Sequence, residues 1–186
     1  RSYALDLAET SGDQIRRLSR LGTRQIDCVF GGPPCQGFSI GGLRDIDDER
    51  NQLVFDFIRL VRELKPLYFV MENVHGLLQS YAKSILESFV RRARYAGYKI
   101  VEPICTLNAA DFGVPQRRVR TIVLGYRKDL PAPKYPSSRG CIDEAGREYS
   151  PKVRDAVSDL VELDADEELF DSDVYRGALR PEYHFA

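Results

Sequence analysis

A cysteine on a stiffened loop, directly after a short and mostly apolar run, constrains this chain more than any other feature. Residues 26–30 form the run, and the sequence Gly-Gly-Pro-Pro-Cys at 31–35 follows it. β-Branched and aromatic residues stopped by glycines predict a buried strand of a parallel sheet. Glycines allow close backbone approach and prolines fix φ, so we expect Cys35 to be held at the carboxyl end of that strand. Open α/β sheets bind their ligands at this edge.

Helical and extended patterns alternate along the rest of the chain. Apolar residues recur at helical spacing in three segments, 14–21, 51–64 and 80–97. A continuous apolar run predicts a second strand at 67–71, and we expect two further strands at 99–107 and 119–126. The alternation predicts an α/β fold with a mostly parallel sheet and a terminal antiparallel strand. Because prolines cluster after residue 130, we expect this domain to span 1–130 and residues 131–186 to begin a different region after a linker.

Composition narrows the class of protein. Apolar residues make up 43% of the 186 and charged residues 30%, with a net charge of -1, which is typical of a soluble globular protein. The sequence contains no run of about 20 apolar residues and no secretory signal, so we expect a cytoplasmic protein without membrane association. Four cysteines without a C-x-x-C pair, and two histidines, predict neither a metal site nor a disulfide framework.

The charges are unevenly distributed. Residues 116–128 carry five basic side chains and no acid, whereas residues 162–173 carry seven acids and no base. A basic segment beside a predicted strand is suited to contact phosphates. We interpret the acidic segment as solvated surface.

Three motifs in order carry a resemblance to a known family. They are the loop Pro-Pro-Cys-Gln at 33–36, Glu-Asn-Val at 72–74 after one predicted strand, and Gln-Arg-Arg-Val-Arg at 116–120 before another. Over about residues 3–130 the chain resembles the bacterial C5 cytosine-specific DNA methyltransferases. The resemblance implies a partial Rossmann-like methyltransferase fold, S-adenosylmethionine as methyl donor and double-stranded DNA as partner. It further implies a restriction–modification, orphan or phage enzyme, associated with the bacterial nucleoid.

The resemblance assigns four catalytic residues. Cys35 is the expected nucleophile, whose thiolate adds to C6 of cytosine and makes C5 reactive. Glu72 is expected to share a proton with N3 of the ring, a role that a buried carboxyl with a raised pKa suits. Arg118 and Arg120 match the arginines of the family's Gln-x-Arg-x-Arg pattern. Because residues two apart on an extended segment share a face, both are expected to point into the site, toward phosphate and toward the base with Glu72.

The resemblance also assigns binding residues. Those expected to line the cofactor pocket are Asp13, Pro34 and Leu53. Asp6 is the alternative to Asp13 for the acid beside the adenine, and for Asp13 an ordinary helix-capping role stays open. Those expected to contact the DNA substrate are Gln36, Ser39, Asn73 and Gln116. The target base must be flipped out of the duplex, and residues 39–50 resemble the segment that closes over it.

The sequence departs from the family pattern at both ends. It lacks the glycine loop that wraps the methionine part of the cofactor, and it stops where the target-recognition region would begin. We therefore expect a partial methyltransferase whose remainder is encoded by the same gene or carried by a second chain. Alone, these 186 residues are expected to bind the cofactor weakly and to methylate little or nothing.

Three alternative functions stay open at this point. A cysteine hydrolase would pair Cys35 with His75 and an acid, although it would also need an oxyanion hole. A tRNA cytosine methyltransferase would keep the chemistry and change the substrate. A non-catalytic subunit would still bind DNA but would not catalyse methyl transfer.

Overall fold

The fold is known from a computed structural model, which describes residues 2–34, 52–138, 141–142, 148–149, 151–153 and 156. Contacts divide the chain into two units. The first comprises residues 1–107 with 119–136, and the second comprises 108–118 with 137–186. The expected domain boundary at residue 130 stays a prediction.

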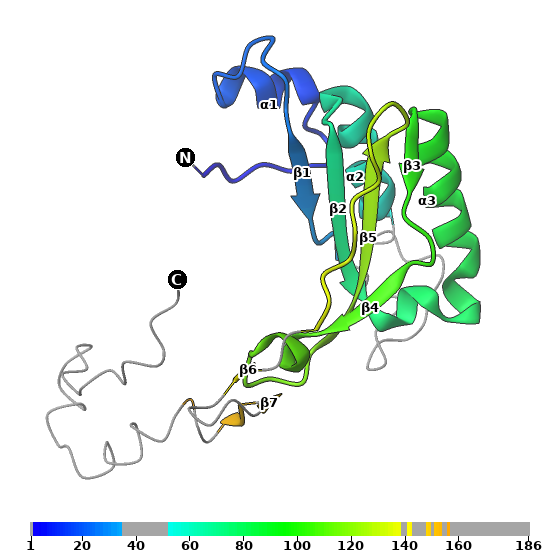
Figure 1. Ribbon diagram of the computed structural model, residues 1–186. Helices are drawn as coiled ribbons and strands as arrows, with labels where there is room; N and C mark the ends of the chain where they lie inside the picture. The colour runs from blue at the N-terminus through cyan, green and yellow to red at the C-terminus, as the bar shows by residue number, and fades with distance from the viewer. Residues whose placement is uncertain are drawn as a thin grey trace, which may run out of the picture. The chain divides into compact units, whose positions relative to one another are not determined.

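The first unit is built on one mixed sheet (Figure 1). Its strands are β1 (Cys28–Gly31), β2 (Tyr68–Val74), β3 (Tyr98–Ile100), β4 (Cys105–Asn108) and β5 (Val119–Arg127). Their order is β1-β2-β5-β3, and β4 also pairs with β5. β1 runs parallel to β2, whereas β5 is antiparallel to β2 and β3. The sequence predicted the antiparallel strand, but this strand lies inside the sheet rather than at its edge.

Two helices cover one face of the sheet. They are α2 (Gln52–Leu64) and α3 (Lys83–Tyr95), and short 3-10 helices, η3 (His75–Leu78) and η4 (Ser80–Ala82), lead into α3. Strands β2 and β5 alternate, and their buried positions supply Phe69, Met71 and Val123 to the core. Phe69 packs edge-on against the rings of Phe57, Phe89 and Tyr98. The helical periodicity in the sequence predicted both helices correctly because each buries one apolar stripe.

Two predicted elements differ from the structure. The helix expected at 14–21 is α1 (Gly12–Leu18), capped by Ser11, and it ends early because Arg20 takes a positive φ of 54°. The strand expected at 99–107 is divided into β3 and β4 around Glu102–Pro103. Proline has no N–H for a sheet ladder, which explains the interruption.

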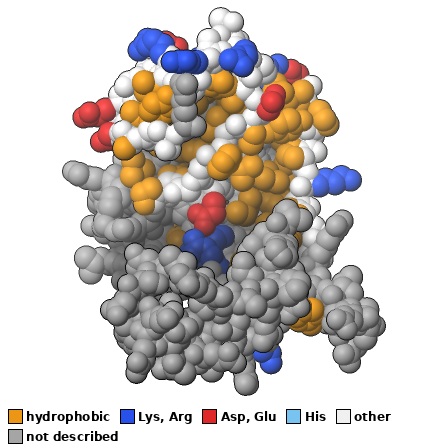
Figure 2. Space-filling model, turned by 90° about the vertical axis from the view of Figure 1, so that its left-hand side faces the viewer, with side chains coloured by type: hydrophobic (Ala, Val, Ile, Leu, Met, Phe, Trp, Pro, Cys, Tyr) orange, Lys and Arg blue, Asp and Glu red, His pale blue; other side chains and the backbone are white. Residues whose placement is uncertain are grey.

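The second face of the sheet is only partly covered among the described residues: it is exposed at β1, whereas the outward positions of β2 and β5 are half-buried. Phe30 of β1 is 83% exposed, and Cys28 of the same strand is also exposed. Figure 2 views the molecule from the β1 side and shows hydrophobic side chains gathered on that surface. The expectation of strands buried on both faces was therefore wrong for β1: an apolar run does not specify how many faces are covered.

The second unit has little regular structure among its described residues. It contains η5 (Ala109–Phe112) and a short antiparallel pair, β6 (Cys141–Ile142) with β7 (Glu148–Tyr149). Asn108 caps η5 by accepting from the N–H of Ala110, and Gly113 ends it at a positive φ of 83°. The sequence also predicts one helix over 150–163, and most of that stretch lies outside the described residues.

Candidate active site

An ion pair stands on the open face of the sheet, toward the carboxyl end of β2. Arg120 Nε of β5 lies 2.8 Å from Glu72 Oε1 of β2. Val74 is the residue opposite Arg120 in the antiparallel register, so Glu72 and Arg120 are diagonal neighbours on one face. Their side chains are 39% and 27% exposed. The sequence predicted that these two side chains meet, and they do; the Glu72 side chain is partly exposed rather than buried.

The loop that leads to Cys35 rests on the same strand. The buried Asn73 donates from Nδ2 to the carbonyl oxygen of Pro33 at 3.1 Å, while its Oδ1 accepts from the N–H of Val74. A Cβ built on Gly32 would lie 3.1 Å from Glu72 Oε2. The loop backbone therefore approaches the carboxylate closely at a position that has no side chain. Glu72 and Asn73 both lie within β2 rather than after it.

The part of the loop that contains the expected nucleophile lies outside the described residues. Cys35, Gln36 and Ser39, and the predicted closing segment 39–50, are not among the described residues. The nucleophilic role of Cys35 and the DNA contacts of Gln36 and Ser39 stay predictions. The other cysteine of this region, Cys28, lies on β1; although the residue is largely exposed, desolvation by its neighbours raises the pKa of its thiol, which disfavours the reactive thiolate.

The three predicted cofactor residues lie on three different segments: Leu53 on α2, Asp13 on α1 and Pro34 on the loop after β1. Pro34 is exposed at the end of the described loop, and Leu53 is half-buried in the first turn of α2. Asp13 is exposed on α1, whose first residue, Gly12, donates its N–H to Glu63 Oε2 in the last turn of α2. Ten residues of helix span about 15 Å, so Asp13 and Leu53 lie near opposite ends of α2. In Figure 1, α1 sits where the arrows of β1 and β2 begin.

The remaining predicted residues belong to the second unit. Arg118 is exposed and donates its backbone N–H to Asn108 Oδ1 at 3.1 Å. Gln116 is also exposed, and its N–H donates to the carbonyl of Val114. Arg118 directly precedes β5 rather than belonging to it. The roles of both side chains stay predictions.

In the part of the chain that the structure describes, no three His, Cys, Asp or Glu side chains gather as metal ligands, and no helix is long and apolar enough to span a bilayer. His75, the base of the hydrolase alternative, is exposed in η3, with its Nε2 3.0 Å from Gln79 Nε2.

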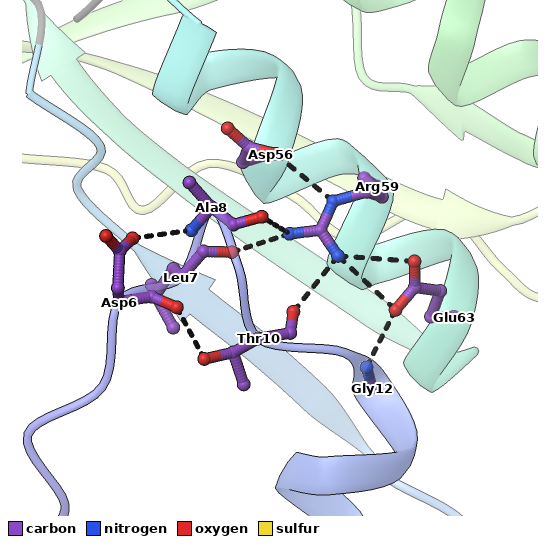
Figure 3. A network of polar contacts seen from close by, with 8 residues as sticks. All are labelled: Asp6, Leu7, Ala8, Thr10, Gly12, Asp56, Arg59 and Glu63. Carbon is purple, nitrogen blue, oxygen red and sulfur yellow. Dashed lines mark hydrogen bonds and ion pairs between the residues drawn. The ribbon is translucent and has the colours of Figure 1, made fainter.

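One polar cluster was missed at the sequence level. Arg59 of α2 contacts Asp56 and Glu63 on its own helix and three backbone carbonyls of the N-terminal segment (Figure 3). The spacing of Asp56, Arg59 and Glu63, three and four residues apart, was the available signal for the helical part. The contacts with the N-terminal segment have no signal in the sequence.

Comparison with known proteins decides the family. The model of the C-5 cytosine-specific DNA methylases matches residues 3–180. The chain belongs to this family. The methylase chain is 43% identical over 167 residues to the type II methyltransferase M.XorII of Xanthomonas oryzae, covering 90% of this chain and 37% of M.XorII. It is 40% identical over 170 residues to M.AquIA of Picosynechococcus, covering 83% of this chain and 68% of M.AquIA.

Solved structures agree with this assignment. The crystal structure of a prophage-encoded DNA modification methyltransferase from E. coli has a TM-score of 0.61 and 31% identity, covering 82% of this chain and 40% of that one. The Entamoeba histolytica methyltransferase EhMeth has a TM-score of 0.55 at 22% identity, covering 73% and 41%, and shows the fold alone. The methylase chain thus spans well under half the length of several relatives that it matches.

Proposed function

We propose that this chain contributes the catalytic centre of a DNA cytosine-5 methyltransferase. The observation that carries the proposal is the Glu72–Arg120 pair at 2.8 Å, standing against the backbone of the Gly32–Pro33 loop that leads to Cys35. Family membership supplies the reaction class, and double-stranded DNA is the proposed substrate. A cytoplasmic, nucleoid-associated location would fit that substrate, and the type II relatives support a restriction–modification setting.

In the proposed reaction, the loop after β1 supplies the nucleophile, and strands β2 and β5 supply the groups that stabilise the base. The Cys35 thiolate adds to C6 of a flipped-out cytosine, which makes C5 nucleophilic toward the methyl group. S-adenosylmethionine, when bound, supplies that methyl group as a sulfonium. Loss of the C5 proton then expels the Cys35 thiolate and leaves 5-methylcytosine. No side chain is assigned as the base for that proton.

Glu72 and Arg120 act on the other edge of the base in this proposal. Addition of the thiolate pushes electron density toward N3 and O2. A carboxyl group that hydrogen-bonds N3, and a guanidinium at O2, would stabilise that density. The pair is open to solvent on one side, so a base can reach it. Asn73 contributes by holding the loop through the Pro33 carbonyl.

The cofactor site is assigned to the carboxyl ends of the strands. Pro34 and Leu53 fit there, with apolar surface that suits an adenosyl group. Asp13 fits less well, because α1 lies by the amino ends of β1 and β2. Asp6 fits better, since Arg59 holds its segment near the middle of α2 rather than at its last turn. A fuller cofactor site and the reading of DNA sequence are proposed to need the regions that longer relatives possess.

The test is covalent trapping. The gene product that contains these residues is incubated with cofactor and DNA carrying 5-fluorocytosine, which cannot lose its C5 substituent as a proton. We expect an adduct resistant to denaturation that disappears in Cys35→Ser and persists in Cys28→Ser. Trapping on tRNA instead of DNA would support the tRNA alternative. An adduct that survives Cys35→Ser would disprove the proposed nucleophile.

A further inference from the structure

We propose that Arg59 is a positioning residue for the cofactor: it fixes the segment that carries the adenine-side acid against α2. This inference rests on the proposed methyltransferase function and adds a residue to it. Residues 6–11 contain a turn and no strand or helix, so their carbonyl groups find no partner in a regular ladder. A turn within the segment satisfies the Asp6 carbonyl through Thr10, and the remaining carbonyls depend on donors from elsewhere.

Arg59 supplies the missing donors. Its Nη2 donates to the carbonyls of Leu7 at 2.5 Å and Ala8 at 3.4 Å, and its Nη1 donates to the carbonyl of Thr10 at 3.1 Å. A planar guanidinium with five N–H groups holds three carbonyls in one arrangement, which a lysine cannot reproduce. Thr10 is 3% exposed, so its bond with Arg59 is partly shielded from water, whereas the bonds to Leu7 and Ala8 are exposed.

Two carboxylates orient the guanidinium in turn. Arg59 Nε donates to Asp56 Oδ1 at 3.1 Å, and Nη1 lies 3.3 Å from Glu63 Oε1. Glu63 also accepts from the N–H of Gly12 at 2.7 Å. A Cβ on Gly12 would lie 2.7 Å from the Glu63 Cβ, so the close contact requires glycine there. Asp56, Arg59 and Glu63 thus anchor both ends of the segment to one helix (Figure 3).

The anchored segment is bounded by the two candidate cofactor acids. Asp6 begins it, with its carboxylate accepting the N–H of Ala8 at 2.9 Å and its carbonyl accepting the Thr10 hydroxyl. Asp13 follows directly after Gly12. Leu53 and Arg59 both belong to α2. The helix therefore fixes the position of the segment relative to the proposed adenosyl surface. Arg59 therefore acts on the cofactor through an acid rather than by contact.

The test separates positioning from stability in the gene product that contains these residues. The proteins compared are the wild type, Arg59→Lys, Glu63→Gln and a control, Arg91→Gln. Arg91 is an exposed arginine that hydrogen-bonds Ser88. For each protein we measure KM for S-adenosylmethionine, KM for DNA, kcat and Tm. We expect Arg59→Lys to raise the cofactor KM about tenfold and to change kcat and the DNA KM little. The effect is smaller than the roughly hundredfold loss of rate when a reacting group is misplaced, because Arg59 acts indirectly. A purely structural role would lower Tm and the active fraction and leave the cofactor KM unchanged, which would overturn the inference.

A double-mutant cycle identifies the acid. If Arg59 acts through Asp6, Arg59→Lys adds little to the cofactor KM of Asp6→Asn; if it acts through Asp13, the same holds for Asp13→Asn. Additive effects with both acids would also overturn the inference. A wild type that methylates nothing would instead disprove the proposed function, so the two failures are distinguishable.

Discussion

The two faces of the sheet differ in how deeply their side chains are buried. The face under α2 and α3 buries Phe69, Met71 and Val123 almost completely. The other face exposes Phe30 and presents the Glu72–Arg120 ion pair. Strand alternation places these sets one residue apart along β2. Neighbouring residues can therefore have different roles: one stabilises the fold, and the next is proposed to contact the substrate.

The difference predicts how substitutions divide. A change on the covered face should cost free energy of unfolding, because close packing leaves no room for adjustment. A change in the half-exposed ion pair should cost turnover and leave the fold intact, because such pairs contribute little to stability.

The largest expected effect is on turnover. Glu72→Gln should lower kcat about 10²–10⁴-fold, because a side chain that shares a proton with the reacting group usually contributes that much to the rate. Tm should change little. Single-turnover methylation of a DNA duplex measures the rate, and thermal unfolding measures Tm. Glu87→Gln, which alters an exposed ion pair with Lys83, is the matched control. A Glu72→Gln protein that unfolds readily but methylates normally would reverse the assignment of the two faces.

The next effect falls on the covered face. A Cβ on Gly125 would lie 2.1 Å from the ring of Phe69, its partner in the β2–β5 register. Gly125→Ala should therefore lower the free energy of unfolding by about 3 kcal/mol, the upper end of overpacking costs. Urea unfolding measures it, with Lys99→Ala at an exposed strand position as control. Unchanged stability would show that this face is less tightly packed than described.

Asn73 connects the two faces, because its buried side chain hydrogen-bonds the loop that leads to Cys35. Asn73→Ala should cost about 1–3 kcal/mol by leaving the Pro33 carbonyl without this donor. It should also slow methylation by loosening the loop before Cys35. Urea unfolding and rate measurements on one preparation test both parts. Normal rates in a destabilised variant would confine Asn73 to the fold.

A smaller effect depends on pH. Burial alone would raise the pKa of Glu63, but the Gly12 N–H and Arg59 lower it overall. A carboxylate with a lowered pKa stabilises the fold above its unfolded pKa and loses that contribution as pH falls through the folded value. Glu63→Gln should thus lower Tm at pH 7, and its difference from the wild type should shrink below about pH 4. A constant difference across this range would contradict the charge-based account.

The smallest effect is expected on the open face away from the ion pair. Phe30→Ser should change the free energy of unfolding by less than about 0.5 kcal/mol, as for other exposed positions. It should also reduce self-association, measured by light scattering, because exposed apolar surface promotes it. A large loss of stability in this chain would show that Phe30 is covered after all.

Much of the fold was predictable from local patterns. The stripes of α2 and α3 and the apolar runs of β1, β2 and β5 specify these elements because burial repeats every 3.6 or 2 residues. The division of β3 from β4 required reading Pro103 as an interruption. The early end of α1 at Leu18 depends on the positive φ of Arg20, which nothing nearby in the sequence demands.

By itself, the sequence determined which chemical groups stand near the ends of which strands: a thiol in a glycine–proline loop, a carboxyl and amide in β2, and arginines at the start of β5. Tertiary structure alone decided which of them meet. The antiparallel register of β2 with β5 brings Glu72 to Arg120, and helix packing brings Arg59 to carbonyls about fifty residues earlier in the chain. Local periodicity encodes the face on which a residue lies, whereas partners distant in sequence depend on the packing of whole elements.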